Sequence, residues 1–124
     1  MVVLGTTDIH GNIYPYDYLA ARARPRGLAQ VATLVQRVRA AEPHTLLVDC
    51  GDTTEGTPLA YVAARQRPSE PNPVVAAMNA MGYDAMAVGN HDFNFGLETL
   101  WRLKGEARFP WLAANVAGFR GDSR

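Results

Sequence analysis

The sequence lacks the features of disulfide-bonded, membrane-spanning and strongly charged proteins. It contains one cysteine, Cys50, among 124 residues, so an intrachain disulfide is excluded. Its apolar runs are all far shorter than the roughly 20 residues that a membrane-spanning helix needs. Basic and acidic side chains number 12 each, which gives a formal net charge of zero. We therefore expect neither a nucleic acid polymer nor a membrane as a partner.

Two local absences bear on compartment and redox chemistry. Met1 leads directly into the apolar residues 2–4, which predict a strand instead of a signal peptide. A cytoplasmic protein is expected if Met1 is the true start, and otherwise a chain that begins inside a longer precursor. Cys50 has no second thiol beside it, so we expect a small buried residue and not a reactive one.

What is present is an alternation of short apolar runs and helical patterns. Four apolar runs predict strands at residues 2–4, 45–48, 85–88 and 111–114. Helices are predicted at residues 28–42, 59–64, 73–81 and 97–104, the third opened by Pro73 and stopped by Gly82. A long loop over residues 13–27 and a frayed tail over residues 118–124 complete the chain. This order predicts an α/β fold with a mostly parallel sheet buried on both faces.

Polar groups with metal-binding chemistry follow three of the predicted strands. They are Asp8-x-His10, Gly51-Asp52 and Gly89-Asn90-His91-Asp92. Because neighbouring parallel strands end at one edge of a sheet, these groups are expected to converge there. Carboxylate, imidazole and amide oxygen together suit a hard or borderline divalent metal.

Each group alone is weak, because polar turns and structural histidines are common. Their joint occurrence in this order predicts a metal centre. Asp8 and His10 can reach one metal, Asp52 can bridge two, and Asn90 offers a neutral oxygen. Two metals about 3.5–4 Å apart would suit phosphoryl transfer, with His91 as a general acid or a hydrogen-bond donor in the transition state. A Rossmann-like nucleotide binder is the weaker alternative, since residues 5–12 lack a G-x-G-x-x-G turn.

These motifs resemble the signature of the calcineurin-like metallophosphoesterases. The surrounding residues 7–12, 27–29, 51–59, 78–85 and 113–116 are similar to the 5′-nucleotidase branch of that family. Within it, residues 15–18 and 93–97 are similar to the 2′,3′-cyclic-nucleotide 2′-phosphodiesterase/3′-nucleotidase group. The resemblance covers nearly the whole chain.

The resemblance implies a fold and an activity. The fold would be the first half of an αββα sandwich, with residues 1–124 as the N-terminal portion of the catalytic domain and no nucleoside-binding domain. The activity would be metal-dependent hydrolysis of nucleotide phosphoesters, in which a hydroxide activated by two metals attacks phosphorus. Two divalent ions, from among Mn, Zn, Fe, Co and Mg, would be the cofactors. Family members are usually exported, which implies a periplasmic or extracellular location.

The resemblance also assigns roles to the metal-binding residues. Asp8 and His10 would bind the first metal, Asp52 would bridge the two metals, and Asn90 would bind the second metal.

Catalysis and substrate binding are assigned in the same way. His91 would be the catalytic histidine, with Asp92 orienting it, and Asn90 and His91 would contact the substrate. Asp49 would either support a metal ligand or form a hydrogen bond within its own loop.

The family completes its site with downstream histidines from a Gly-His motif and a His-x-His-like segment, which residues 1–124 do not contain. The alternative function is therefore an incomplete fragment that binds metal weakly, or an interaction module that needs a second half. Half a sandwich leaves one apolar sheet face uncovered. We expect that face to bind the other half of the domain or a second copy of the chain.

Overall fold

The structure is a computed structural model in which residues 1–117 are described. The frayed tail predicted for residues 118–124 lies outside them. A four-stranded sheet organises the chain, with strand order β1-β4-β5-β6. Its strands are β1 (Val2–Thr6), β4 (Thr45–Asp49), β5 (Ala85–Ala87) and β6 (Trp111–Leu112). All three pairings are parallel, which confirms the α/β prediction.

Helices and short connecting elements fill the rest of the chain. They are α1 (Leu28–Ala41), α2 (Pro58–Tyr61), the π-helix η1 (Val62–Gln66), α3 (Pro73–Met81), the 3-10 helix η2 (His91–Phe93) and α4 (Leu97–Glu106). The helix predicted at residues 59–64 is thus a short α-helix that continues as a π-helix. The predicted loop over residues 13–27 contains an antiparallel hairpin of β2 (Tyr16–Asp17) and β3 (Arg22–Ala23).

Helix α1 begins after Gly27, which has a backbone conformation that only glycine adopts easily. Its φ is +98°, and a Cβ atom there would lie 2.7 Å from the Ile13 carbonyl oxygen. Leu28 and Val35 face the core and are buried. Leu34, directly before Val35 in the sequence, is 59% exposed. The core therefore covers a narrow stripe along one side of α1.

Helix α3 has the boundaries that its capping residues predict. The Asn72 side chain accepts hydrogen bonds from the backbone N–H groups of Val74 and Val75, and Pro73 occupies the first turn. Gly82 ends the helix in the left-handed conformation, with φ +66°. The Arg39 guanidinium of α1 donates to the Gly82 carbonyl, which joins the two helices.

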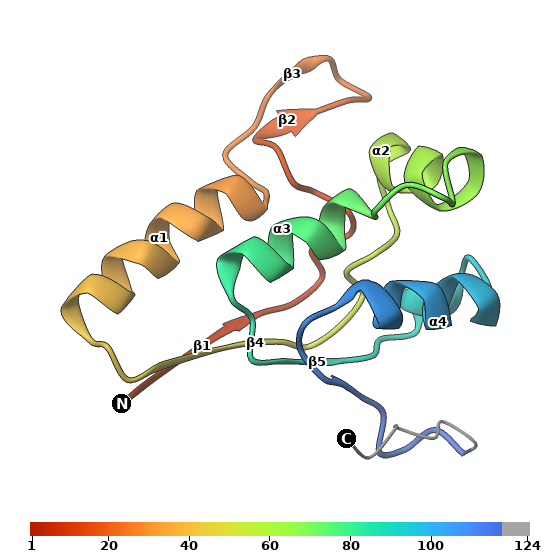
Figure 1. Ribbon diagram of the computed structural model, residues 1–124. Coiled ribbons are helices and arrows are strands. Elements are labelled where there is room, and N and C mark those ends of the chain that lie inside the picture. Colours follow the sequence, from red (N-terminus) through yellow and green to blue (C-terminus); the bar gives the residue numbers. More distant parts are fainter. Residues whose placement is uncertain (118–124) are drawn as a thin grey trace.

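The core lies between the sheet and helices α1, α3 and α4, which all lie on the same side of it (Figure 1). Leu47, Met86 and Trp111 point to that side and are buried. The opposite face is open: Val3, Leu46 and Leu112 are 58%, 43% and 54% exposed. The prediction of a sheet buried on both faces is therefore wrong for this chain, because an apolar strand does not specify what covers it. No helix among residues 1–117 is long and apolar enough to cross a membrane.

Candidate metal centre

The loops that follow β1 and β4 lie side by side because the parallel pairing continues beyond the strands. The Asp8 N–H donates to the Gly51 carbonyl at 3.0 Å, and the His10 N–H donates to the Asp52 carbonyl at 2.9 Å. The Gly11 N–H donates to the Thr53 carbonyl at 2.8 Å. The first two sequence motifs therefore meet at one edge of the sheet, as the strand order predicts.

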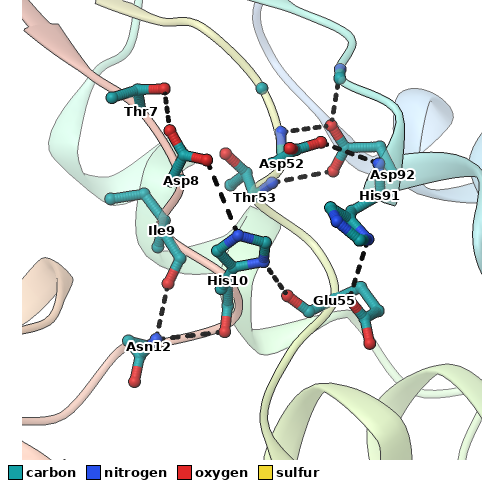
Figure 2. A network of polar contacts seen from close by, with 12 residues as sticks. Thr7, Asp8, Ile9, His10, Asn12, Asp52, Thr53, Glu55, His91 and Asp92 are labelled. Carbon is teal, nitrogen blue, oxygen red and sulfur yellow. Dashed lines mark hydrogen bonds and ion pairs between the residues drawn. The ribbon is translucent and has the colours of Figure 1, made fainter.

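Asp8, His10 and Asp52 form a compact group of ligand atoms (Figure 2). One ligand atom from each lies within 4.8 Å of the other two. Their φ angles are +53°, +47° and +56°, a region that residues other than glycine seldom adopt. Such a conformation costs on the order of 1–3 kcal/mol and persists where the surroundings impose it, often at functional sites. Here the hydrogen bonds between the two loops impose it.

The His10 ring is oriented as a metal ligand requires. Its Nδ1 lies 3.3 Å from the Glu55 carbonyl oxygen, which can only accept a hydrogen bond. Nδ1 therefore carries the proton, and Nε2 presents its lone pair 3.7 Å from the Asp8 Oδ1 atom. Metal-binding histidines commonly use this arrangement, in which the second ring nitrogen donates to a carbonyl. The donor set and its tautomer therefore fit a divalent metal ion.

The third motif reaches the same place through Asp52. The His91 backbone N–H donates to Asp52 Oδ1 at 2.8 Å, and the His10 and His91 rings lie 5.3 Å apart at 66°. Gly89 is required by this contact, since a Cβ atom there would lie 2.3 Å from Asp52 Oδ1. Asn90 is exposed and its side chain makes no capping bond at the start of η2, so the helix does not use its amide oxygen.

Asp92 has a different set of partners from the one expected. It is 2% exposed, and its carboxylate lies away from the His91 ring (Figure 2). The carboxylate accepts hydrogen bonds from the backbone N–H groups of Gly89, Asp52, Thr53 and Thr54, and from the Thr54 hydroxyl. Asp92 therefore ties the loop after β4 to the loop after β5 and does not contact the imidazole it was expected to orient.

Two other residues hold the His91 ring. Asn94 Nδ2 lies 3.0 Å from His91 Nδ1, and Glu55 Oε2 lies 3.8 Å from the same atom. Sequence reasoning missed both. Asn94 follows His91 by three residues, a spacing that brings side chains together in a 3-10 turn, so a local signal was present. Glu55 belongs to the loop after β4 and approaches only through the tertiary fold.

The chain matches a known protein family along nearly its whole length. The family model of calcineurin-like phosphoesterases matches residues 1–121. This chain belongs to the calcineurin-like phosphoesterase family. The resemblance inferred from the sequence motifs is thereby confirmed.

Individual relatives agree with that membership. The trifunctional nucleotide phosphoesterase protein YfkN of Bacillus subtilis is 42% identical over 130 residues, covering 98% of this chain and 9% of the relative. The 2′,3′-cyclic-nucleotide 2′-phosphodiesterase/3′-nucleotidase of Yersinia enterocolitica is 39% identical, covering 92% of this chain and 18% of the relative. This chain thus spans less than a fifth of either curated relative.

A solved structure supports the fold. The crystal structure of the calcineurin-like phosphoesterase YfkN from Bacillus subtilis superposes with a TM-score of 0.84 at 40% identity. The superposition covers 89% of this chain and 35% of the solved one. The parallel sheet with its flanking helices is therefore the arrangement found in a member of the same phosphoesterase family.

Next to the site lies a second buried carboxylate, Asp49. It accepts hydrogen bonds from the hydroxyls of Thr6 and Thr53 at 2.6 and 2.5 Å, and from the Gly51 N–H at 2.9 Å. Of the two roles considered for Asp49, hydrogen bonding within its own loop is therefore observed. Burial raises the pKa of Asp49 and the nearby Asp92 charge adds to this, while the three hydrogen bonds oppose it.

Cys50 corrects a prediction made from the same stretch. It was expected to be buried, but its side chain is exposed. Consecutive side chains of an extended segment alternate between faces. Because Asp49 is directed into the protein, Cys50 is directed out of it.

Proposed function

We propose that this chain provides the first half of a two-metal centre in a hydrolase that acts on the phosphoesters of nucleotides. The hydrolase would be of the 5′-nucleotidase or the 2′,3′-cyclic-nucleotide phosphodiesterase/3′-nucleotidase type. The observation that carries the proposal is the grouping of Asp8, His10 and Asp52 within 4.8 Å, with the His91 ring beside them. Family membership and the nucleotide substrates in the names of two relatives support it.

The proposed ligands divide between two positions. Asp8 and His10 would hold one divalent ion, Asp52 would contribute to both positions, and Asn90 would offer its amide oxygen to the second. Mn, Zn, Fe, Co and Mg are all candidates, because oxygen and imidazole donors suit each of them. When bound, such ions polarise phosphoryl oxygens and activate a water nucleophile.

His91 is the proposed proton donor. Asn94 and Glu55 both face Nδ1, which leaves Nε2 to donate a proton to the departing alkoxide or a hydrogen bond to a phosphoryl oxygen. A ring that gives a proton from Nε2 is an imidazolium, and it keeps the proton on Nδ1 before and after the transfer. The Asn94 amide, turned so that its oxygen faces Nδ1, accepts a hydrogen bond from that proton in both states. Asn94 is therefore suited to hold the ring throughout a proton transfer.

Asp92 acts indirectly in this proposal, through the backbone of the two loops. Its carboxylate holds the backbone of Gly89 and Asp52, and so sets the position of a metal ligand and of the residue that precedes Asn90. It contributes by fixing the two loops and not by touching substrate.

A second candidate function rests on the open sheet face of Val3, Leu46 and Leu112. A parallel sheet is normally covered on both faces. The chain would then be a module that binds metal weakly by itself and becomes a catalyst only when a second half of the domain, or a second copy, covers that face.

The test measures metal content and hydrolysis separately in three variants. Manganese bound per chain is counted, and turnover of bis-p-nitrophenyl phosphate and 3′-AMP is followed. Asp52→Asn is expected to lower metal content and abolish turnover, since one of its oxygens becomes a nitrogen. His91→Ala is expected to keep the metal and lose about 10²–10⁴-fold in turnover. His44→Ala, an exposed histidine outside the site, is the matched control.

The outcomes separate the two candidates. Unchanged turnover in His91→Ala would contradict the proton-donor role. Metal bound by the wild-type chain without any hydrolysis would favour the incomplete module. No metal uptake beyond that of Asp52→Asn would contradict both.

A further inference from the structure

The three side chains of the candidate metal centre are held in place by different contacts. The His10 ring faces the Glu55 carbonyl oxygen through Nδ1, and Asp52 Oδ1 accepts a hydrogen bond from the His91 N–H group. Each of these contacts comes from a different loop, so the tertiary fold positions both ligands. Asp8 is exposed, whereas His10 and Asp52 are half-buried. The side chain of Asp8 therefore has the least support from the surrounding fold.

One hydrogen bond holds the Asp8 carboxylate, and it comes from the preceding residue. The Thr7 hydroxyl donates to Asp8 Oδ2 at 2.5 Å, a usual length for a hydroxyl bound to a carboxylate (Figure 2). The other oxygen, Oδ1, lies 3.7 Å from His10 Nε2. Among residues 1–117 the carboxylate has no further partner. Oδ2 is therefore directed to Thr7, and Oδ1 to the atom of His10 that would bind a metal.

The backbone after β1 makes this contact possible. Consecutive side chains of an extended strand point to opposite faces of the sheet, so a threonine there would not reach the carboxylate of the next residue. Strand β1 ends at Thr6, and Asp8 has a φ of +53°. The alternation is thus broken at Asp8, and its carboxylate lies next to the Thr7 hydroxyl. The hydrogen bond from the Asp8 N–H to the Gly51 carbonyl fixes this conformation.

We propose that Thr7 is a positioning residue of the metal centre, which holds Asp8 so that Oδ1 alone is presented to the first metal position. The inference rests on the proposed function, in which Asp8 and His10 bind that metal. It adds to the site a residue that lies outside the D-x-H motif.

The hydrogen bond from Thr7 has two consequences for metal binding. An exposed carboxylate loses rotational freedom when it binds an ion, and a carboxylate that is already ordered loses less. The Thr7 hydroxyl also occupies a lone pair of Asp8 Oδ2, which favours binding of the ion through Oδ1 only. Removing a hydrogen-bond partner of a metal ligand typically lowers metal affinity about 10–100-fold.

The experiment measures the order of the Asp8 side chain without metal, and manganese affinity separately. In the metal-free chain, the Hα–Hβ scalar couplings of Asp8, measured by NMR, are expected to have the values of a single χ1 rotamer in wild type and in Thr7→Ser, which both carry the hydroxyl. In Thr7→Val a methyl group replaces the hydroxyl, and the couplings should take averaged values. Titration with manganese is expected to show an affinity about 10–100-fold lower for Thr7→Val and close to wild type for Thr7→Ser.

Thr33→Val is the matched control, since Thr33 is an exposed threonine of α1 whose hydroxyl bonds to its own helix. Thr7→Ala provides a second variant in case Thr7→Val does not fold. A single Asp8 rotamer in the folded variant without the hydroxyl, an unchanged manganese affinity there, or equally weak binding by Thr7→Ser would overturn the inference. A wild-type chain that binds no manganese, while loss of the hydroxyl still frees Asp8, would contradict the proposed function and leave the positioning of Asp8 by Thr7 standing.

Discussion

At the residue scale, two buried carboxylates lie next to the site and accept hydrogen bonds from different sets of donors. Asp92 accepts four backbone N–H groups and one hydroxyl. Asp49 accepts two hydroxyls and one N–H group. Burial penalises the charge on Asp49 more than these bonds compensate, so its pKa is raised.

This raised pKa predicts a pH-dependent effect of Asp49→Asn. A carboxyl group whose folded pKa is raised stabilises the fold below its unfolded pKa of about 3.9, and that contribution is lost as the pH rises through the folded pKa. Asparagine does not titrate. The wild-type advantage in free energy of unfolding over Asp49→Asn should therefore be larger near pH 4 than at neutral pH, as measured by urea unfolding.

The substitution keeps the local hydrogen bonds available. The asparagine oxygen can accept from Thr53 and Gly51, and its Nδ2 group can donate to Thr6, whose hydroxyl then donates to Tyr83 at 2.9 Å. Comparing the two proteins at each pH cancels the titration of all other groups. A stability difference that does not change with pH, or that grows toward neutral pH, would contradict the assignment.

At the element scale, Glu106 at the end of α4 joins that helix to both ends of α3. The Asn72 side chain caps α3, while its backbone N–H donates to Glu106 Oε2 at 2.6 Å. Asn79 of α3 donates to the Glu106 carbonyl at 2.9 Å. The cap is fully buried, so no water can replace it.

Asn72→Ala is expected to lower the free energy of unfolding by about 1–2 kcal/mol. The loss comes from two helix N–H groups that would be left without an acceptor. The Asn72 Nδ2 group has no partner among the described residues, and its removal offsets part of this loss. Denaturant unfolding measures the change. Asn115→Ala, at an exposed position, should stay within about 0.5 kcal/mol of wild type. Equal stability of Asn72→Ala and wild type would show that the cap is not stabilising.

At the scale of the whole molecule, the helices cover only one face of the sheet. The open face carries Val3, Leu46 and Leu112 on three different strands, and Val3 pairs directly with Leu46. Exposed apolar side chains on an uncovered sheet face mark an interface or a site of aggregation.

We therefore expect the isolated chain to self-associate, and Leu46→Lys to shift it toward monomer. A lysine in the middle of the open face would have to be desolvated in any such contact. Size-exclusion chromatography with light scattering measures the distribution. Leu34→Lys is the matched control, since Leu34 is an exposed leucine on the outside of α1. A wild-type chain that elutes as a stable monomer would contradict this prediction.

The sequence by itself determined the features that depend on short stretches of chain. Apolar runs indicated where the strands lie along the chain, and Pro73 and Gly82 indicated the ends of α3. The motifs at the strand ends predicted that Asp8 and His10 would lie close to Asp52. These follow from local backbone preferences and from the geometry of parallel sheets, in which neighbouring strands end at one edge.

The tertiary structure decided the features that depend on contacts between distant segments. It placed Leu46 on an uncovered face and turned Cys50 outward. It directed Asp92 to the loop backbone, and brought Glu55 to both site histidines. A residue's type limits the partners it can have, but only the packing of separate elements decides which partner lies within reach.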